Sequence, residues 1–231
     1  KRAAGKPVTA DRELVSLIMR ALEFSELTQG AIDITYASAG RLYDYREGKK
    51  PDRDVIEQAL PAIDYHHVRV DAADGTVRFL QPGVHIDLGG IAKGYAVDRS
   101  IARLKAAGVE HALVSAGGDT RVLGKRWGRA WQVGIRDPRS AAGVVTMIPL
   151  QNAAISTSGD YERYFEEDGV RYHHILNPGT GDSARGVRSV SIIGSDATTT
   201  DALSTRIFVL GVSDGLKLVD SLPDIEAVDR K

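Results

Sequence analysis

The chain has 231 residues, and 42% of them are hydrophobic, so it is long enough to bury a substantial core. Thirty basic residues against thirty-one acidic ones leave a formal net charge of −1, which excludes a global field that would draw the chain onto nucleic acid or an anionic membrane. There is no cysteine, which excludes disulfides, thiolate metal ligands and a cysteine nucleophile, and no apolar run approaches the ~18 residues of a membrane span. We therefore expect no nucleic-acid partner and no membrane span in this chain.

The N-terminal third begins with a helical pattern. Apolar residues recur at helical spacing between Leu14 and Leu22, which predicts a helix that ends before Gly30. An apolar and aromatic stretch over 31–45 and a polar loop over 46–52 follow, and we expect a short helix over 54–62.

The period then changes from helical to alternating. Asp74-Gly75 separates two alternating segments, 67–70 and 76–80, and this tight-turn dipeptide predicts a hairpin. We expect a further short strand over 85–88. Apolar residues with helical spacing predict a helix over 91–107, which Gly108 ends.

Strand signals dominate the second half of the chain. The predicted strands are 112–115, 120–123, 131–135, 144–150, 171–176, 187–194 and, last, 225–228. Helices are predicted over 200–210 and 214–221. Because strands come in runs and helices are few, we predict an α+β fold with mainly antiparallel sheets and a few packed helices, in a single domain over 1–231.

The segment 198–211 is the first candidate site. Residues four apart on a helix share a face, so the Asp201 carboxylate and the Thr205 hydroxyl would point to the same place. Hard oxygens suit Mg²⁺, which needs few protein ligands when phosphates supply the rest. Taken alone, the segment is more typical of a capped core helix than of a metal site, because Asp near a helix start often caps and Thr often bonds back to its own helix.

The second candidate is the segment His85–Asp98. Paired glycines at a helix start favour an anionic ligand such as phosphate, and Lys93 adds positive charge in the first turn. The spacing is neither that of a Walker loop nor that of a dinucleotide fingerprint. An ordinary turn with Asp87 as a cap and a solvated Lys93 remains open.

The third candidate is the pair His173 and His174. On an alternating strand the two side chains face opposite sides, so they cannot both serve one metal, but either can act as a base near neutral pH. A strand histidine bonded to the neighbouring backbone is the alternative. The segments 115–119 and 156–160 are interpreted as turns that offer amides or hydroxyls to a ligand.

In this order, six segments resemble the ApbE family, whose members are FAD:protein FMN transferases. They are Gly30–Thr35, Asp87–Asp98, Ser115–Asp119, Ser156–Gly159, His174–Pro178 with Gly181, and Asp201–Thr205. The resemblance covers nearly the whole chain, and it leads us to expect a single ApbE-like domain that lacks the family's N-terminal strands.

The resemblance implies an enzyme that binds FAD with Mg²⁺, cleaves the pyrophosphate and attaches FMN by a phosphoester bond to a threonine or serine of a partner flavoprotein. Carried over by position, it makes Asp201, Thr205 and the Gly90 carbonyl the Mg²⁺ ligands and His174 the base. The residues implied to contact FAD are Ala31, Ile32, Asp33, Asp87, Lys93 and Ile175.

Two other activities remain open at this point. An Mg²⁺-dependent FAD pyrophosphatase would release FMN and AMP to water with the same groups, and a non-catalytic protein would bind flavin without turnover. By analogy with the family, we expect a periplasmic location or a membrane tether facing the periplasm.

Overall fold

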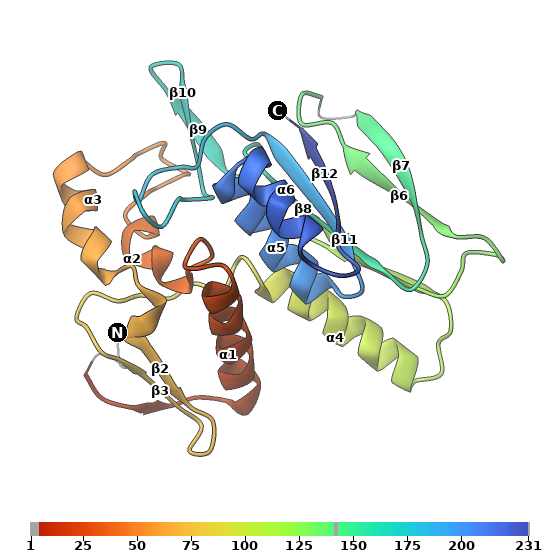
Figure 1. Cartoon of the computed structure of the whole chain (residues 1–231), viewed down its shortest axis with the longest axis horizontal. Helices are drawn as coiled ribbons and strands as arrows, with labels where there is room; N and C mark the ends of the chain where they lie inside the picture. The colour runs from red at the N-terminus through yellow and green to blue at the C-terminus, as the bar shows by residue number, and fades with distance from the viewer. Residues whose placement is uncertain (1–4, 141–142, 231) are drawn as a thin grey trace. The chain divides into compact units, whose positions relative to one another are not determined.

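The computed structural model describes residues 5–140 and 143–230. Its internal contacts divide the chain into two units (Figure 1). The first unit comprises 1–88 and 162–184, and the second comprises 89–161 and 185–231. Each unit is described by itself.

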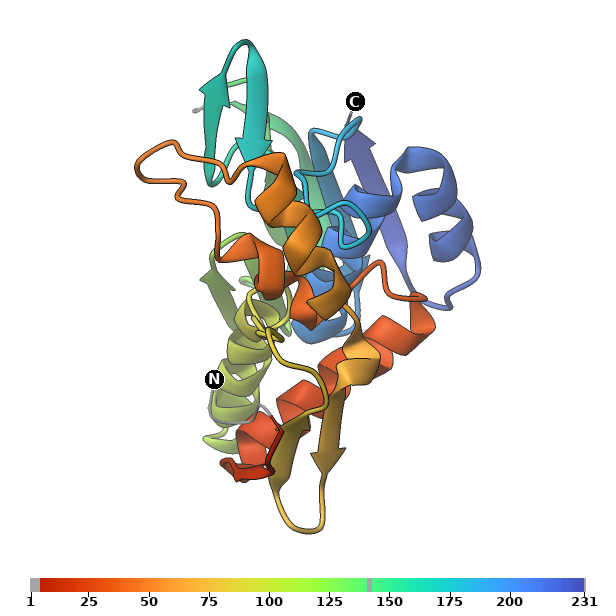
Figure 2. The ribbon, with the colours of Figure 1, turned by 90° about the vertical axis from the view of Figure 1, so that its left-hand side faces the viewer.

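The first unit is built around one amphipathic helix and a small sheet. Helix α1 (Arg12–Leu27) begins at Asp11, whose carboxylate accepts the Glu13 N–H, and it buries one apolar face. Strands β1 (Val8–Thr9), β3 (Thr76–Phe79) and β2 (Val68–Asp71) form an antiparallel sheet in the order β1-β3-β2. The hairpin β2–β3 runs beside α1 (Figure 2).

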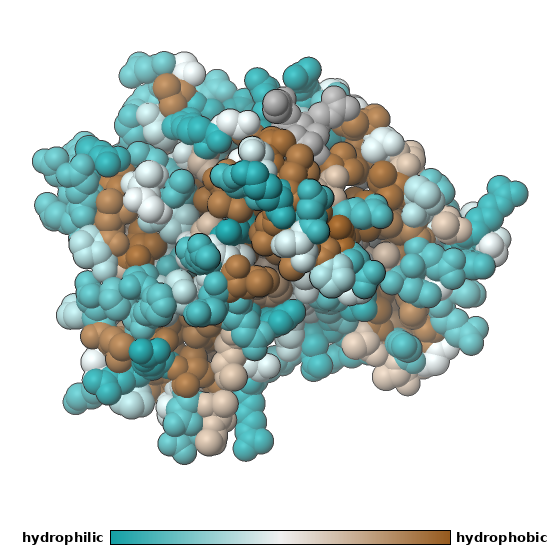
Figure 3. All heavy atoms as spheres, viewed as in Figure 1, coloured by the Kyte–Doolittle hydropathy of each residue, from teal (hydrophilic) through white to brown (hydrophobic). Residues whose placement is uncertain are grey.

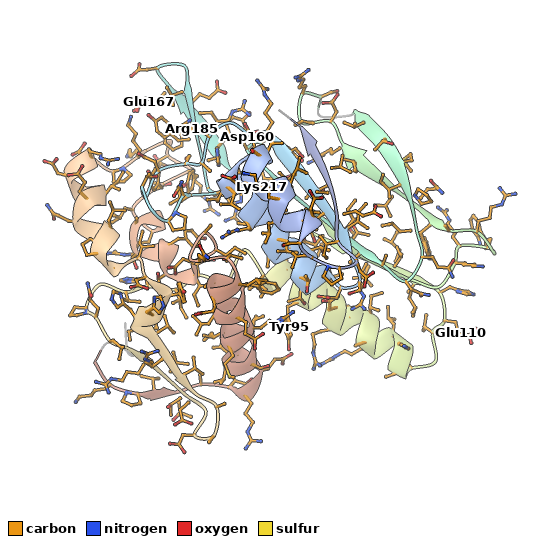
Figure 4. The ribbon with its side chains drawn as sticks, in the orientation of Figure 1. Tyr95, Glu110, Asp160, Glu167, Arg185 and Lys217 are labelled. Carbon is orange, nitrogen blue, oxygen red and sulfur yellow. The ribbon has the colours of Figure 1, made fainter. Side chains whose placement is uncertain are left out.

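Short helices and a second hairpin complete this unit. The helices are the 3₁₀ turns η1 (Ile34–Tyr36), η2 (Leu60–Ala62) and η3 (Tyr65–His67), with α2 (Ala37–Gly40) and α3 (Arg53–Ala59). Strands β9 (Tyr164–Glu167) and β10 (Val170–His173) pair as an antiparallel hairpin. Glu167 on this hairpin (Figure 4) forms an ion pair of 2.6 Å with Lys50.

The second unit is organised by a five-stranded antiparallel sheet in the order β12-β11-β8-β5-β4. Its strands are β4 (Ala112–Ala116), β5 (Asp119–Leu123), β8 (Ala154–Gly159), β11 (Ser189–Gly194) and β12 (Glu226–Arg230). Because side chains alternate along a strand, Ser156 and Ser158 of β8 share one face and Ile155 belongs to the other.

Helices cover one face of this sheet, and a hairpin covers the other. Helices α4 (Ala92–Ala106) and α5 (Ala197–Leu210) pack against the sheet and against each other, and α6 (Val212–Asp220) follows α5 (Figure 1). Strands β6 (Trp131–Arg136) and β7 (Val144–Leu150) pair and bury Ile135 and Leu150 against Val122 and Ile155. Val144 and Met147 of this hairpin are exposed, and Figure 3 shows how hydrophobic and hydrophilic residues are distributed over one face of the molecule.

The fold confirms the predicted α+β class with antiparallel sheets. The predicted hairpin and the predicted helix before Gly108 are found with nearly the same bounds as β2, β3 and α4. The helix predicted over 200–210 begins three residues earlier, because carboxylates bond the N–H groups of its first turn. The prediction of one domain over 1–231 stays a prediction.

Three predictions of local structure were wrong. Residues 85–88 form no strand: the His85 N–H donates to the Ser38 hydroxyl, and the Asp87 N–H donates to the Ile34 carbonyl of a 3₁₀ turn. The strand predicted over 171–176 ends at His173. The segment 156–160, interpreted as a turn, is mostly the strand β8 in the interior of the sheet.

No helix among residues 5–140 and 143–230 combines the length and the apolar character that crossing a membrane requires.

Candidate functional site

Two buried carboxylates share one lysine in the second unit. Nζ of Lys93, on the first turn of α4, lies 2.8 Å from Oδ1 of Asp201 on α5 and 3.1 Å from Oδ2 of Asp119 at the start of β5. The same ammonium donates to the Gly89 carbonyl at 3.2 Å. The ammonium thus donates hydrogen bonds to two of these oxygens, those of Asp201 and Gly89, and its contact with Asp119 is an ion pair that lacks the alignment of a hydrogen bond.

Burial sets the electrostatics of this cluster. Asp119 and Asp201 are 1% and 2% exposed, and burial raises the pKa of both carboxyl groups because the charged form loses its hydration. At Asp119 the nearby charge of Asp201 adds to burial and raises the pKa to about 6. Burial alone would lower the pKa of Lys93, but the two carboxylates outweigh it and the pKa is raised. The cluster therefore holds excess negative charge when both carboxyl groups are ionised.

Asp201 also caps a neighbouring helix. Its Oδ2 accepts the Gly94 N–H of α4 at 3.0 Å, and Ile91, at the N-cap of α4, supplies no side-chain cap. The helices meet closely there, because a Cβ on Gly94 would lie 2.1 Å from the Ala197 carbonyl oxygen. The alternative prediction that Asp201 caps a helix is thus partly right, although it caps α4 and not its own helix α5.

Carboxylates also anchor the start of α5. The Ala197 and Thr198 N–H groups donate to the two oxygens of Asp98 at 2.9 and 2.8 Å, and the Thr199 N–H donates to Asp196 at 2.8 Å. Negative charge at a helix N-terminus stabilises it. The first turn is therefore held in place, and Asp201 follows one turn later.

Gly90 and Thr205 lie together at the other end of the cluster. A Cβ built on Gly90 would lie 3.6 Å from Thr205 Oγ1, so the backbone of the glycine turn faces this hydroxyl. Thr205 Oγ1 is 3.2 Å from the Ser158 hydroxyl of β8. The structure thus brings together Gly90, Lys93, Asp201 and Thr205 within the second unit.

These donors fit a hard cation held by few protein ligands. The described residues contain no group of three or more His, Asp or Glu side chains that would form a complete metal site. Two ionised carboxylates nevertheless carry one more negative charge than the single positive charge of Lys93 neutralises. One oxygen of Asp119 also has no aligned hydrogen-bond donor. Mg²⁺ is bound in this manner when substrate phosphates and water complete its shell.

In the first unit, Asp33 is bonded differently from Asp201. Its Oδ1 accepts the Thr35 N–H at 2.7 Å and the Thr35 hydroxyl, and its Oδ2 accepts the Tyr65 N–H at 2.8 Å. Burial raises the pKa of Asp33, and these hydrogen bonds oppose the rise. The carboxylate therefore joins the turns η1 and η3, and η1 directly follows the loop that carries Ala31 and Ile32.

Asp87 lies beside that loop. Its N–H donates to the Ile34 carbonyl at 2.9 Å, and its carboxylate bonds the Tyr36 hydroxyl. Burial and the charge of Asp87 raise the pKa of Tyr36. The structure thus brings the 31–33 stretch and Asp87 together in the first unit.

The two histidines are distinguished by their hydrogen bonds. His173 is 3% exposed, and its Nε2 lies 2.8 Å from the Ala184 carbonyl, so Nε2–H donates and the ring serves the loop. His174 lies just beyond β10, is less buried, and its N–H donates to the Arg163 carbonyl at 3.1 Å. Ile175 is buried, and its carbonyl accepts the Ala184 N–H. Of the two histidines, His174 is the more exposed one.

Two site residues were missed by sequence reasoning. Asp119 and Ser158 were interpreted as parts of turns and of segments that carry the ApbE resemblance, but neither was given a role of its own, and Ser158 was not assigned to a central strand. The Gly117-Gly118 pair before Asp119 was the available signal, because both glycines have positive φ and Gly117 packs on the Lys93 side chain. No local signal places Ser158 against α5.

Fold and site together define an α+β protein with a buried oxygen cluster suited to a cation and an anionic ligand. A family model described as "ApbE family" matches residues 1–228. The chain belongs to the ApbE family.

Named relatives and solved structures agree with this. A protein named FAD:protein FMN transferase from Treponema pallidum is 37% identical over 98% of this chain and 68% of its own length. One of the same name from Klebsiella pneumoniae is 34% identical over 98% of this chain and 72% of its own length. The ApbE protein of Thermotoga maritima is 44% identical with a TM-score of 0.90, over 99% of this chain and 76% of that one.

The share covered differs among relatives. The apo flavinyl transferase ApbE of Pseudomonas stutzeri is 31% identical with a TM-score of 0.85, over 99% of this chain and 73% of that one. The chain spans only 41% of a relative from Rhodobacter capsulatus, also named FAD:protein FMN transferase, at 35% identity over 92% of this chain.

Proposed function

We propose that this protein is an Mg²⁺-dependent FAD:protein FMN transferase that attaches FMN to a threonine or serine of a partner flavoprotein. The observation that carries the proposal is the cluster of Lys93, Asp119 and Asp201 beside Thr205, in a chain whose relatives bear that enzyme name. Family membership supports the substrate FAD and the class of reaction.

The transfer requires one bond to form and one to break. The acceptor hydroxyl oxygen bonds to the phosphorus of the FMN moiety, the bond from that phosphorus to the bridging oxygen breaks, and AMP leaves. The hydroxyl proton goes to His174, which in its neutral form is a base near neutral pH. A bound Mg²⁺ would supply charge stabilisation for the phosphoryl oxygens.

The remaining roles follow from the residues' positions. Asp201, Thr205 and the Gly90 carbonyl would hold the cation, and Lys93 would keep Asp201 oriented while it faces the substrate phosphates. Ala31, Ile32, Asp33, Asp87 and Ile175 would contact FAD. Because both Asp33 oxygens already accept hydrogen bonds from its own unit, we assign the contact of the 31–33 stretch to its main chain and to Ile32.

The proposal is tested by incubating the protein with FAD, Mg²⁺ and a candidate acceptor and measuring the acceptor's mass. We expect a mass gain equal to FMN less water, AMP release, and loss of both when Mg²⁺ is chelated. Replacement of Asp201 by alanine should abolish turnover, and unchanged Mg²⁺-dependent activity would rule out its role.

The same assay separates the other two activities. Release of FMN and AMP without a modified acceptor would identify a pyrophosphatase, and binding of FAD without products would identify a non-catalytic flavin protein. The periplasmic location stays a prediction from the resemblance. Fractionation of cells that express the full gene product would test it.

A further inference from the structure

Three hydroxyl groups connect β8 to the helix that carries Asp201. Thr205 Oγ1 lies 3.2 Å from Ser158 Oγ, and Ser158 Oγ lies 2.8 Å from Ser204 Oγ. Ser204 Oγ in turn donates to the main-chain carbonyl of Asp201 at 3.0 Å. The row of hydrogen bonds thus ends at the main chain of Asp201, whose side chain is the carboxylate that bonds Lys93.

Counting the hydroxyl protons shows which group donates in each of these hydrogen bonds. A carbonyl only accepts, so the single hydroxyl proton of Ser204 is committed to Asp201. Ser204 therefore accepts from Ser158, which commits the Ser158 proton. Ser158 can then only accept from Thr205.

The helix itself reinforces this direction. A threonine inside a helix commonly bonds back to the carbonyl four residues earlier, which for Thr205 is that of Asp201. Ser204 occupies that carbonyl. Within the part of the chain that the structure describes, Thr205 Oγ1 bonds to Ser158 and to no carbonyl of its own helix.

We propose that Ser158 and Ser204 are positioning residues that make the Thr205 hydroxyl donate its proton to Ser158, so that its lone pairs stay directed at a divalent cation. The inference rests on the proposed function, since the cation is the one assigned there. Ser204 is 1% exposed, so water does not compete for its proton. Partners of this kind, which orient a ligand without touching the metal, typically change metal affinity by ~10–100-fold.

The test measures cation affinity directly. Mn²⁺ is titrated into the full chain at 4 °C with saturating FAD and no acceptor, and the free ion is read by electron paramagnetic resonance. The variants Ser158→Thr and Ser158→Val have the same shape and differ in one hydroxyl. We expect Ser158→Thr to bind Mn²⁺ as the wild type does and Ser158→Val to bind roughly tenfold more weakly.

A matched control isolates the hydroxyl chain from general loosening of the sheet. Ser191 of β11 is also buried and bonds Thr157 on β8 at 2.8 Å, but it has no link to Thr205. Ser191→Ala should leave the Mn²⁺ affinity unchanged. The double variant Ser158→Val/Thr205→Val should bind no more weakly than Thr205→Val alone, because Ser158 acts through Thr205.

The outcomes separate this inference from the proposed function. If the wild type binds no Mn²⁺, the metal part of the proposed function is wrong and the role of Ser158 falls with it. If the wild type binds but Ser158→Val binds equally well, or if Ser191→Ala weakens binding as much, only the positioning role is overturned. Additive losses in the double variant would overturn it as well.

Discussion

Asp33 and Asp201 are two buried carboxylates with opposite consequences. Burial raises the pKa of both, and each accepts a main-chain N–H. Asp33 is surrounded by neutral donors from its own unit, whereas Asp201 shares Lys93 with a second buried carboxylate. Burial therefore does not mark a site by itself; the excess of negative charge at Asp201 and Asp119 does.

The largest expected effect comes from separating α4 from α5 where Asp201 bonds Gly94. Gly94→Ala places a Cβ 2.1 Å from the Ala197 carbonyl and 2.8 Å from the Asp201 Cβ, so α4 must move away from α5. We expect the free energy of unfolding to fall by about 3 kcal/mol, measured by urea denaturation. Ser100→Ala on the same helix is the control and should change it by less than about 0.5 kcal/mol. An unchanged Gly94→Ala would show that the helices do not meet at this residue.

The second prediction compares the loss of the Asp33 carboxylate with the loss of the Asp201 carboxylate. Asp33→Ala leaves the Thr35 and Tyr65 N–H groups without their acceptor, and we expect a loss of about 2 kcal/mol in stability with Mg²⁺-dependent turnover retained below the melting temperature. Asp201→Asn keeps the shape, so the protein should stay folded while turnover falls at least ~100-fold. Thermal melts and turnover rates of both variants check this. The reverse pattern would show that the reaction needs the Asp33 side chain and does not need the Asp201 carboxylate.

The raised pKa of Asp119 predicts a pH dependence of stability. With a folded pKa of about 6 against an ordinary value of 3.8, the native state binds more protons than the unfolded state between pH 4 and 6. The free energy of unfolding therefore falls as pH rises through that window, by on the order of 2 kcal/mol, and levels off above it. The proton belongs to the Asp119 and Asp201 pair together.

Asp119→Asn should remove this fall. Urea denaturation of both proteins at pH 4.5, 5.5 and 6.5 gives the difference that isolates Asp119 from the other titrating groups. Parallel curves for the two proteins would contradict the raised pKa.

The smallest expected effect sharpens the contrast between exposed and buried ion pairs. Lys217 on α6 (Figure 4) lies 2.8 Å from Asp214, with side chains 74% and 63% exposed. Water screens such a pair, so Lys217→Ala should change stability by less than about 0.5 kcal/mol. A loss above 1 kcal/mol in thermal or urea denaturation would show that the pair is not screened.

Local patterns predicted much of the fold. The 3.6-residue period over 91–107 and the Asp74-Gly75 turn gave α4 and the β2–β3 hairpin close to their observed bounds, because both signals are local. The strand predicted over 85–88 is absent because the His85 N–H donates to the Ser38 hydroxyl and not to a neighbouring strand. Strand β8 was missed because Ser156, Thr157 and Ser158 read as a polar turn, and only bonds to α5 and β11 make them interior residues.

For the site, the spacing of Asp201 and Thr205 on one helix face and the glycine turn before Lys93 were determined by the sequence itself, since i and i+4 neighbours need no partner element. The tertiary structure alone decided that Asp119 joins Asp201 on Lys93, that Asp201 caps α4, and that Ser158 faces Thr205. These contacts join residues 26 to 108 positions apart in the chain, depending on the pair, and only the packing of α4, α5 and the sheet sets such distances.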